Sequence, residues 1–452
     1  MKAMGRYIVL WLIAAAVCVA GFAQETTPAL TLEDAVKLAL KRNFEVIIAE
    51  EQLNELKGKI KEVRSGAYPQ VSLQGYGLRL RDPSILNSSS FDKVPPEFKE
   101  ALIPSASNMF DVGINIKQPL YTAGKVRTAV KLAEESLEEK KSSWEASRQQ
   151  VTFKVFQAFH DLLLALANQD VVKENHGLRV KHLEQAQVRY KNGVATQIDV
   201  LRSEVDVANI QPVLIRAENR IRLARAAINN LIVEDLEAPT RIAGSLEYRP
   251  WIVSSLEEMQ RRALEFRPEL HAARRIVSEA NLTLKLAQAE NKLSVDFDAH
   301  YGYTMREIRN VFDTDFTRWN FTFNFKLPFY DSGRKSGLVI QALSRQRAAE
   351  QRLGQLENDV KLEVKQAYDD MQSSAQAIEA ARLSVTQAER VLAMMQANYE
   401  YGAATTLDVT DSQTALTIAR NSQVSATYDY EVAKARLRLA SGSPILDSEV
   451  NP

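Results

Sequence analysis

Two segments of the chain alternate apolar with polar or small residues, with the period of a β-strand. The apolar positions are Val112, Ile114 and Ile116 in one segment and Trp319, Phe321, Phe323 and Phe325 in the other. A period of two predicts strands with a single apolar face. Shorter alternating segments lie before each of them, at residues 71–74 and 295–298. We therefore expect one β-hairpin within residues 68–118 and a second within residues 293–327.

Long stretches with few helix breakers surround these hairpins. Residues 125–191 contain no proline and one glycine, which predicts a single helix of about 100 Å at 1.5 Å per residue. A returning helix is expected over residues 196–231, interrupted by Pro212, and a shorter helix from Thr31 to about Arg64 precedes the first hairpin. Apolar residues such as Leu201 and Val205 recur at coiled-coil spacings, so these helices are expected to pack side by side.

The chain is a tandem duplication. A shift of 224 positions places Leu32, Ala39 and Glu45 on Leu256, Ala263 and Glu269, and a shift of 209 places Pro119, Tyr190 and Asp199 on Pro328, Tyr399 and Asp408. The first repeat then covers residues 24–232 and the second covers 256–440, with a linker at 233–255 and a tail at 441–452. The second repeat carries its long helices at 334–401 and 405–440. An insertion rich in Pro and Ser within residues 78–110 makes the first copy longer, and it is expected to be an exposed loop.

The first 23 residues have the features of a secretory signal peptide. Lys2 and Arg6 precede an apolar run over residues 8–20, and small residues at 21 and 23 provide a cleavage site. An inner-membrane anchor is the alternative, but it needs about 18 or more apolar residues. The single cysteine, Cys18, is expected to leave with this leader.

Composition excludes several classes of function. The 57 basic residues balance the 57 acidic residues, so a strongly basic surface for nucleic acid is absent from the sequence. One cysteine and five histidines favour neither a disulfide framework nor a metal site, and phosphate-loop and hydrolase motifs are missing. We expect no enzyme, no cofactor and no metal. His176 and His182 are expected on the surface, and Phe153, Phe156 and Phe159 are expected in helix packing.

Four alternating strands cannot close a barrel alone, because membrane barrels have about eight strands or more and open edges are excluded from lipid. Three copies would supply twelve strands and enclose a water-filled pore. On this interpretation the apolar strand residues face lipid: Val112, Ile114, Ile116, Trp319, Phe321, Phe323 and Phe325. A soluble sheet with one buried face is the alternative interpretation of the alternation.

With these features the sequence resembles the TolC-like outer-membrane efflux proteins of Gram-negative bacteria. The resemblance covers about residues 31–442 and includes two strand exits, residues 118–124 and 327–333, and the two helix-reversing tips. It implies an α+β membrane protein whose long antiparallel helices form a coiled-coil periplasmic tunnel below a shared trimeric 12-stranded β-barrel. It also implies a homotrimer in the outer membrane that works with a periplasmic adaptor protein and an inner-membrane pump or ABC transporter. The segments 233–255 and 439–452 resemble the belt around the family's tunnel.

The resemblance assigns roles to residues at the two tips. The adaptor-docking tips are Gly193, Val194, Ala195 and Thr196 in the first repeat and Gly402, Ala403, Ala404 and Thr405 in the second. The same tips are also explained by a helix-ending glycine followed by a capping threonine.

Two further assignments concern the periplasmic entrance. Tyr399 and Asp199 match a closed-state lock, whereas Ala404 occupies the position of the lock's arginine, so we expect a leaky entrance. Asp408 and Asp411 share a helix face and match a ring of carboxylates that gates the entrance and selects cations. Asp408 could instead complete a capping box with Thr405.

The transported substrate does not follow from the sequence, since drugs, metal ions, metabolites and polypeptides all leave through ducts of this kind. A coiled-coil structural or adhesive protein of the envelope remains the alternative function. It explains the leader and the helices but leaves the aromatic strands without a use.

Overall fold

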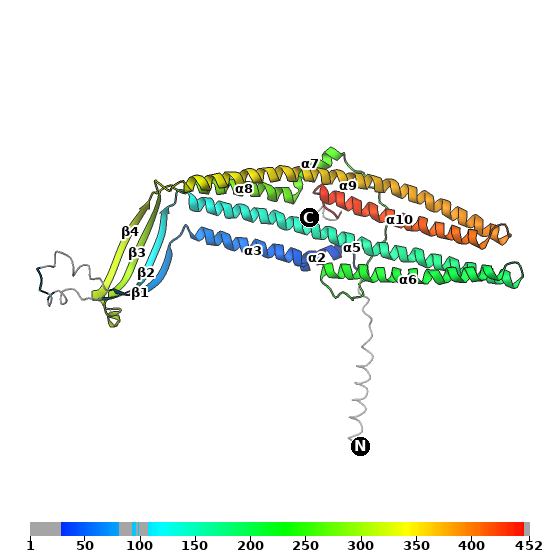
Figure 1. The fold of residues 1–452 in the computed structure, drawn as a ribbon, viewed down its shortest axis with the longest axis horizontal. Coiled ribbons are helices and arrows are strands. Elements are labelled where there is room, and N and C mark those ends of the chain that lie inside the picture. Colours follow the sequence, from blue (N-terminus) through cyan, green and yellow to red (C-terminus); the bar gives the residue numbers. More distant parts are fainter. Residues whose placement is uncertain (1–28, 81–92, 96–97, 99–106, 447–452) are drawn as a thin grey trace, which may run out of the picture. The chain divides into compact units, whose positions relative to one another are not determined.

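A computed structural model describes residues 29–80, 93–95, 98 and 107–446 (Figure 1). The expected signal peptide, most of the 78–110 insertion and residues 447–452 of the tail lie outside the described residues. Contacts along the chain divide it into two compact units. The first unit comprises the described residues of Met1–Ile47, Ser147–Leu264 and Val360–Pro452, and the second those of Ile48–Ala146 and Glu265–Asp359.

The second unit contains a four-stranded antiparallel sheet in the order β1-β2-β3-β4 (Figure 1). Its strands are β1 (Gln70–Leu80), β2 (Ser107–Tyr121), β3 (Ser294–Met305) and β4 (Thr317–Lys326). Two 3-10 turns, Ile308–Asn310 and Thr314–Phe316, lie between β3 and β4. Strand β2 continues three residues beyond position 118, where we expected the hairpin to end. A register shift between Pro119 and Tyr121 accommodates the proline, which has no N–H to donate.

The register of the sheet places most apolar strand residues on one face. Leu73 pairs with Ile114, Ile114 with Tyr301, and Tyr301 with Trp319. This face is exposed over most of its area, and Phe325, Trp319 and Phe321 are each more than 60% exposed. Val112 differs, because it is only partly exposed. A sheet face with this many exposed aromatic side chains needs an apolar surrounding.

The opposite face of the sheet is more polar and carries a charged cluster, although Tyr76, Leu78 and Leu80 of β1 also lie on it. Asp111 is 7% exposed and accepts a hydrogen bond from Thr304 Oγ1 at 2.6 Å. His300 Nε2 lies 3.6 Å from Asp111 Oδ1, and Arg318 Nη1 lies 3.9 Å from Oδ2. The buried carboxylate is therefore surrounded by donors from β3 and β4, as a buried charge requires.

The expected helix from Thr31 to Arg64 is in fact two helices, α2 (Leu32–Arg42) and α3 (Phe44–Ser65). Asn43 breaks it in an extended conformation, and its side-chain oxygen accepts from the N–H of Glu45 at 2.9 Å. The second repeat breaks at the equivalent position, Arg267, between α7 (Leu256–Phe266) and α8 (Pro268–Gln288). There the cause is Pro268, because a residue before proline avoids the helical conformation.

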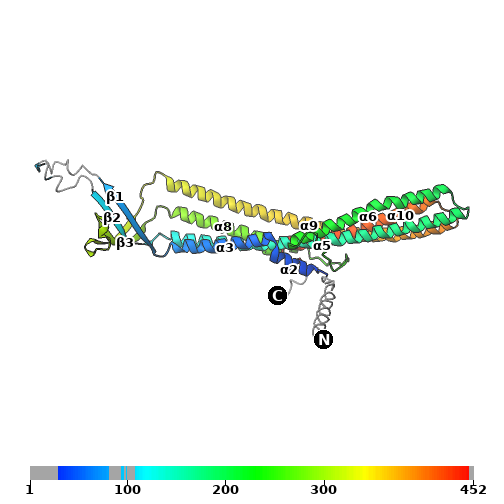
Figure 2. The same ribbon diagram turned by 90° about the horizontal axis from the view of Figure 1, so that it is seen from below.

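Four long helices carry the rest of the chain. They are α5 (Lys125–Lys191), α6 (Gln197–Ile232), α9 (Arg334–Glu400) and α10 (Thr406–Ala440). Within the first unit α6 returns along α5 and α10 returns along α9 (Figure 1 and Figure 2). Pro212 lies inside α6 without ending it, contrary to the expected interruption. Among the described residues, every helix is too polar or too short to be a candidate for crossing a membrane.

The core of the first unit lies where α2, α5, α6 and α10 meet. Its buried residues include Val36, Val155, Phe156, Phe159, Leu162, Ile228 and Val432. Phe153, Phe156 and Phe159 belong to this core, which confirms that they serve helix packing. The segment after α6 is bound to it through Asn229, whose amide donates to the carbonyls of Asp235 and Ala238 at 3.0 and 3.1 Å.

Candidate functional site at the two hairpin tips

Both tips of the first unit reverse the chain at a glycine with a left-handed backbone. φ is +74° at Gly193 and +77° at Gly402, a conformation that L side chains rarely adopt. In the first tip the N–H of Val194 donates to the carbonyl of Arg189 at 2.9 Å, and in the second the N–H of Ala403 donates to that of Asn398 at 2.8 Å. This is the Schellman pattern that ends a helix. The glycines are thus explained by backbone geometry alone, and the docking role of the tips stays a prediction.

A capping box starts the returning helix at each tip. Asp199 Oδ2 accepts from the N–H and the hydroxyl of Thr196 at 3.0 and 2.7 Å, while the N–H of Asp199 donates back to Thr196 Oγ1. Thr405 and Asp408 repeat the arrangement at 2.8 and 2.7 Å. Hydrogen bonds from the threonine side chains hold the pKa of both Asp199 and Asp408 below the usual range. Asp408 is therefore a capping residue in addition to any role at a gate.

The predicted lock residues Tyr399 and Asp199 approach each other through a third residue. Thr406, 3% exposed, lies with its hydroxyl 3.3 Å from Asp199 Oδ1 and 3.4 Å from the Tyr399 hydroxyl. One hydroxyl has one proton, so donation from Thr406 to the carboxylate leaves its oxygen to accept from Tyr399. The three residues form a relay between the two hairpins of one chain. Sequence reasoning missed Thr406, because its role depends on its burial between the two hairpins and no motif in the sequence marks that burial.

An arginine from α5 lies beside this relay. The guanidinium of Arg189 lies 4.8 Å from the centre of the Tyr399 ring and donates to the carbonyl of Glu400 at 3.0 Å. The sequence predicted only that the arginine of the family lock is lost at Ala404. The structure brings a different arginine to the same tyrosine, from the other repeat.

His182 on α5 is buried, which corrects the expectation of a surface histidine. It is 4% exposed, and its ring lies 5.0 Å from the ring of Tyr399. Burial lowers the pKa of His182, while Asp206 and Asp199 oppose that shift. His176 is partly buried, with Nε2 3.3 Å from Nε2 of Gln211. The sequence spacing of the two histidines carried no information on how α5 packs against α9.

The two predicted gate carboxylates lie on the first turns of α10, where both are exposed. Asp408 uses Oδ2 for its cap. Asp411 lies one turn farther along the helix, where the first repeat has Arg202. Gating and cation selection by these residues stay predictions.

Two grooves lie near the tips, one between α6 and α10 and one between α5 and α9. One of about 340 Å³ is lined by Ile198, Leu201 and Val205 of α6 and by Leu407 of α10. A second of about 520 Å³ is lined by Val188 and Arg189 of α5 and by Tyr399 and Glu400 of α9. Neither has the chemistry of a metal centre, and across the part of the chain that the structure describes no three His, Cys, Asp or Glu side chains gather to hold a metal.

Comparisons with known proteins agree with this architecture. A family model described as "Outer membrane efflux protein" matches residues 35–232 and 260–443. The chain is 24% identical to the outer membrane protein TolC of Vibrio cholerae over 384 residues, which is 84% of this chain and 83% of that protein. It is 24% identical to the alkaline protease secretion protein AprF of Pseudomonas aeruginosa, over 65% of this chain and 62% of that protein.

Solved structures show the same fold. The CmeC outer membrane channel of Campylobacter jejuni superposes with a TM-score of 0.77 at 16% identity, covering 91% of this chain and 85% of that one. The duplicated order of helix, hairpin and long helices is confirmed as the fold of the chain.

Proposed function

The chain belongs to the outer membrane efflux protein family, and from this we propose that three copies form a passive exit duct through the outer membrane. Each copy contributes four strands to a shared barrel and its long helices to a tunnel in the periplasm. Substrates delivered by a pump pass through this duct to the outside. No bond of the substrate is made or broken, so the chain needs neither a catalytic residue nor a cofactor.

The edges of the sheet support the sharing of one barrel. Strands β1 and β4 are the outer strands, so each carries backbone N–H and C=O groups that the described sheet does not pair. Unpaired backbone groups are too costly to leave in lipid. Pairing of β4 of one copy with β1 of the next closes the ring, with Trp319, Phe321, Phe323 and Phe325 facing lipid along with Ile114 and Ile116. Val112, which is less exposed, contributes less to that surface.

An exposed row of apolar residues on α6 supports the same assembly in the tunnel. Ile198, Leu201, Val205 and Ile215 are each more than half exposed, and they recur at spacings of three, four and ten residues on one helix face. Such a seam is typical of a helix that packs against another helix. A neighbouring copy would cover it.

The tips are the proposed contact with a periplasmic adaptor, which in turn connects the duct to an inner-membrane pump or ABC transporter. Val194 and Ala403 are exposed next to the two glycines and have ordinary backbone angles. They are better test sites than Gly193 and Gly402, where a bulky side chain strains the backbone. We expect Ala403→Trp to abolish efflux in cells while the trimer and its membrane insertion remain intact, and normal efflux would exclude docking through this tip.

The cargo is proposed from the family alone. The relatives include an alkaline protease secretion protein, AprF, and a cation efflux system protein, CusC of Escherichia coli, so polypeptides and cations are both open. Cross-linking of the duct to its adaptor and pump, followed by identification of the pump, decides between them.

The observation that carries the proposal is the four-stranded sheet with one exposed aromatic face and two open edges. The protein extracted in detergent should therefore have three times the chain mass, and in planar bilayers it should form discrete channels. A monomeric or filamentous protein without channel activity would instead identify a structural protein of the envelope.

A further inference from the structure

Helix α10 has two faces of opposite chemistry. One face packs against α9 through an apolar cluster made of Leu416 and Ala419 of α10 and Val385 and Leu392 of α9. The other face meets α5 and α6 through polar residues. These are Thr406, Thr410, Gln413 and Thr414, which recur at spacings of four, three and one. Near the tips, the seam within the second hairpin is thus apolar, whereas the seam between the two hairpins is mainly polar, with Leu178 of α5 as an apolar exception. Farther from the tips, α5, α6 and α10 share the apolar core of the first unit.

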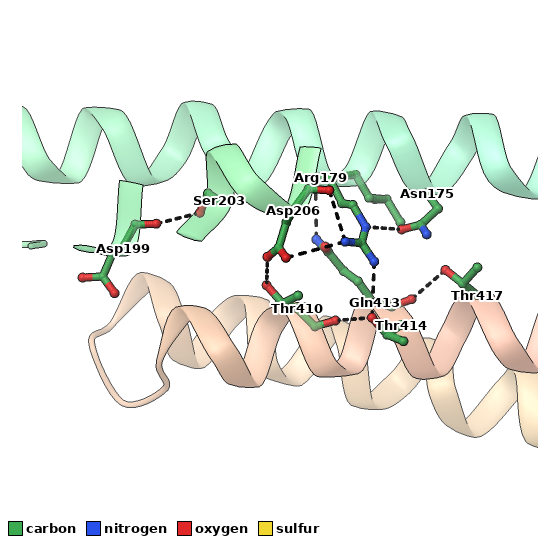
Figure 3. A network of polar contacts seen from close by, with 10 residues as sticks. Asn175, Arg179, Asp199, Ser203, Asp206, Thr410, Gln413, Thr414 and Thr417 are labelled. Atoms are coloured by element: carbon green, nitrogen blue, oxygen red, sulfur yellow. Dashed lines mark hydrogen bonds and ion pairs between the residues drawn. The ribbon is translucent and has the colours of Figure 1, made fainter. Parts of the chain in front are cut away.

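The centre of the polar seam is Arg179 of α5 (Figure 3). Its Nε donates to Asn175 Oδ1 at 3.2 Å, its Nη2 donates to Thr414 Oγ1 at 3.3 Å, and its Nη1 lies 3.8 Å from Asp206 Oδ1. Asp206 of α6 accepts in turn from the Thr410 hydroxyl at 3.1 Å. Arginine and aspartate therefore connect three helices, and both connections to α10 end on threonine hydroxyls.

The contacts of Arg179 and Asp206 are shielded from water while the two hairpins lie together. The side chains of Arg179 and Asp206 are 13% and 27% exposed, so water competes little for the pair. Gln413 is 1% exposed, and its amide points to the Leu178 carbonyl at 3.5 Å. When α10 separates from α5, hydrogen bonds to water replace these contacts. The free energy cost of separating a polar seam is therefore small compared with that of an apolar seam.

We propose that Arg179, Asp206, Thr410 and Thr414 form a separable latch that holds the second hairpin against the first and thereby keeps the tunnel entrance narrow. The latch lies one to two helical turns beyond the relay of Tyr399, Thr406 and Asp199, and is distinct from it. Because it uses no residue of the predicted lock, it can hold the two hairpins together even with Ala404 in place of an arginine. The expected change in channel opening rests on the proposed channel function, whereas the contact between the two hairpins does not depend on that function.

Single-channel recording of the purified protein tests the latch. Arg179→Ala and Thr410→Val should each raise the probability of the wide open state about tenfold, which corresponds to the loss of one hydrogen bond to a charged group. The matched control is Arg222→Ala, since Arg222 bonds only to Asn219 of its own helix in the described contacts. Thr410→Val keeps the shape of the side chain, so it stays informative if Arg179→Ala fails to assemble. Open probabilities equal to that of the control would overturn the latch.

A charge swap and a distance measurement complete the test. Arg179→Asp and Asp206→Arg should each open the channel, and the double swap should restore at least part of the closed population. Spin labels at positions 204 and 415, in trimers diluted with unlabelled chains, should move apart in Thr410→Val. If the wild type gives no channels, the proposed function fails, while an increased label distance still supports the latch. An unchanged distance together with unchanged currents would refute it.

Discussion

The two hairpin tips are copies of one another in sequence, yet their side chains lie in different surroundings. Gly193, Thr196 and Asp199 have the same backbone geometry and the same capping box as Gly402, Thr405 and Asp408. The tyrosines that end the two outgoing helices differ sharply, however. Tyr190 is 46% exposed, whereas Tyr399 is 6% exposed and bonds to Thr406.

The two tips therefore share their local features and differ in their tertiary contacts. The turn and the cap depend on neighbours within five residues, so the same local sequence gives the same geometry in both copies. The relay depends on tertiary packing. In the second tip, the ring of Tyr399 contacts Arg189 and His182 of α5. Each residue of the second tip consequently has a control at the equivalent position of the first.

The largest effect is expected from the gate carboxylates. Replacing Asp408 and Asp411 with Asn should weaken block by a trivalent cation by more than tenfold, because threefold symmetry gathers six carboxylates at the second tip. Asn at position 408 can still accept the cap hydrogen bonds. The equivalent first-tip change, Arg202→Ala, should leave the block unchanged. Equal block in both variants would place the cation site elsewhere.

The two tyrosines give the next test. Tyr399→Phe removes one hydroxyl from the relay and should raise the leak conductance several-fold, as expected for a bond worth about 1 kcal/mol. Tyr190→Phe removes the same hydroxyl from an exposed site and should change nothing. Both currents can be recorded in the same bilayer system, and a similar increase in the two variants would contradict the relay.

A smaller effect is expected from pH. The lowered pKa of His182 means that the packed state resists protonation, so its stability is complete above about pH 6.5 and falls as the pH drops below that value. Conductance should therefore rise between pH 7.5 and 5.5, and His182→Gln should flatten that rise. His176→Gln is the control. A full pH response in His182→Gln would show that other groups open the tip.

The smallest effect should be the same at both tips. Thr196→Ala and Thr405→Ala each remove a capping hydroxyl and should lower the free energy of unfolding by about 1 kcal/mol. Thermal unfolding of the trimer measures both. A large difference between the two variants would mean that the caps are not equivalent.

Much of the fold could be predicted because its signals are local. The duplication, the strand alternation and the long helices follow from periodicity and from the absence of proline. The break at Arg267 is readable from Pro268, but the break at Asn43 is not, because it depends on a side chain that also donates to the Leu231 carbonyl at 3.2 Å.

The site was less predictable, because its contacts join residues far apart in the sequence. Tyr399 and Asp199 were identified by resemblance, whereas Thr406, Arg189 and Arg179 depend on how α5 packs against α9 and α10. Neither hydrophobic period nor motif spacing records that packing. The burial of His182 was missed for the same reason.

The most direct test of the account is block of the unmodified duct from one side. The purified protein, inserted in one orientation in a planar bilayer, should show discrete cation-selective channels. A trivalent cation should block them when added on the side of the hairpin tips, and much more weakly from the opposite side. Absence of channels, or equal block from both sides, would contradict a pore that is gated at the second tip.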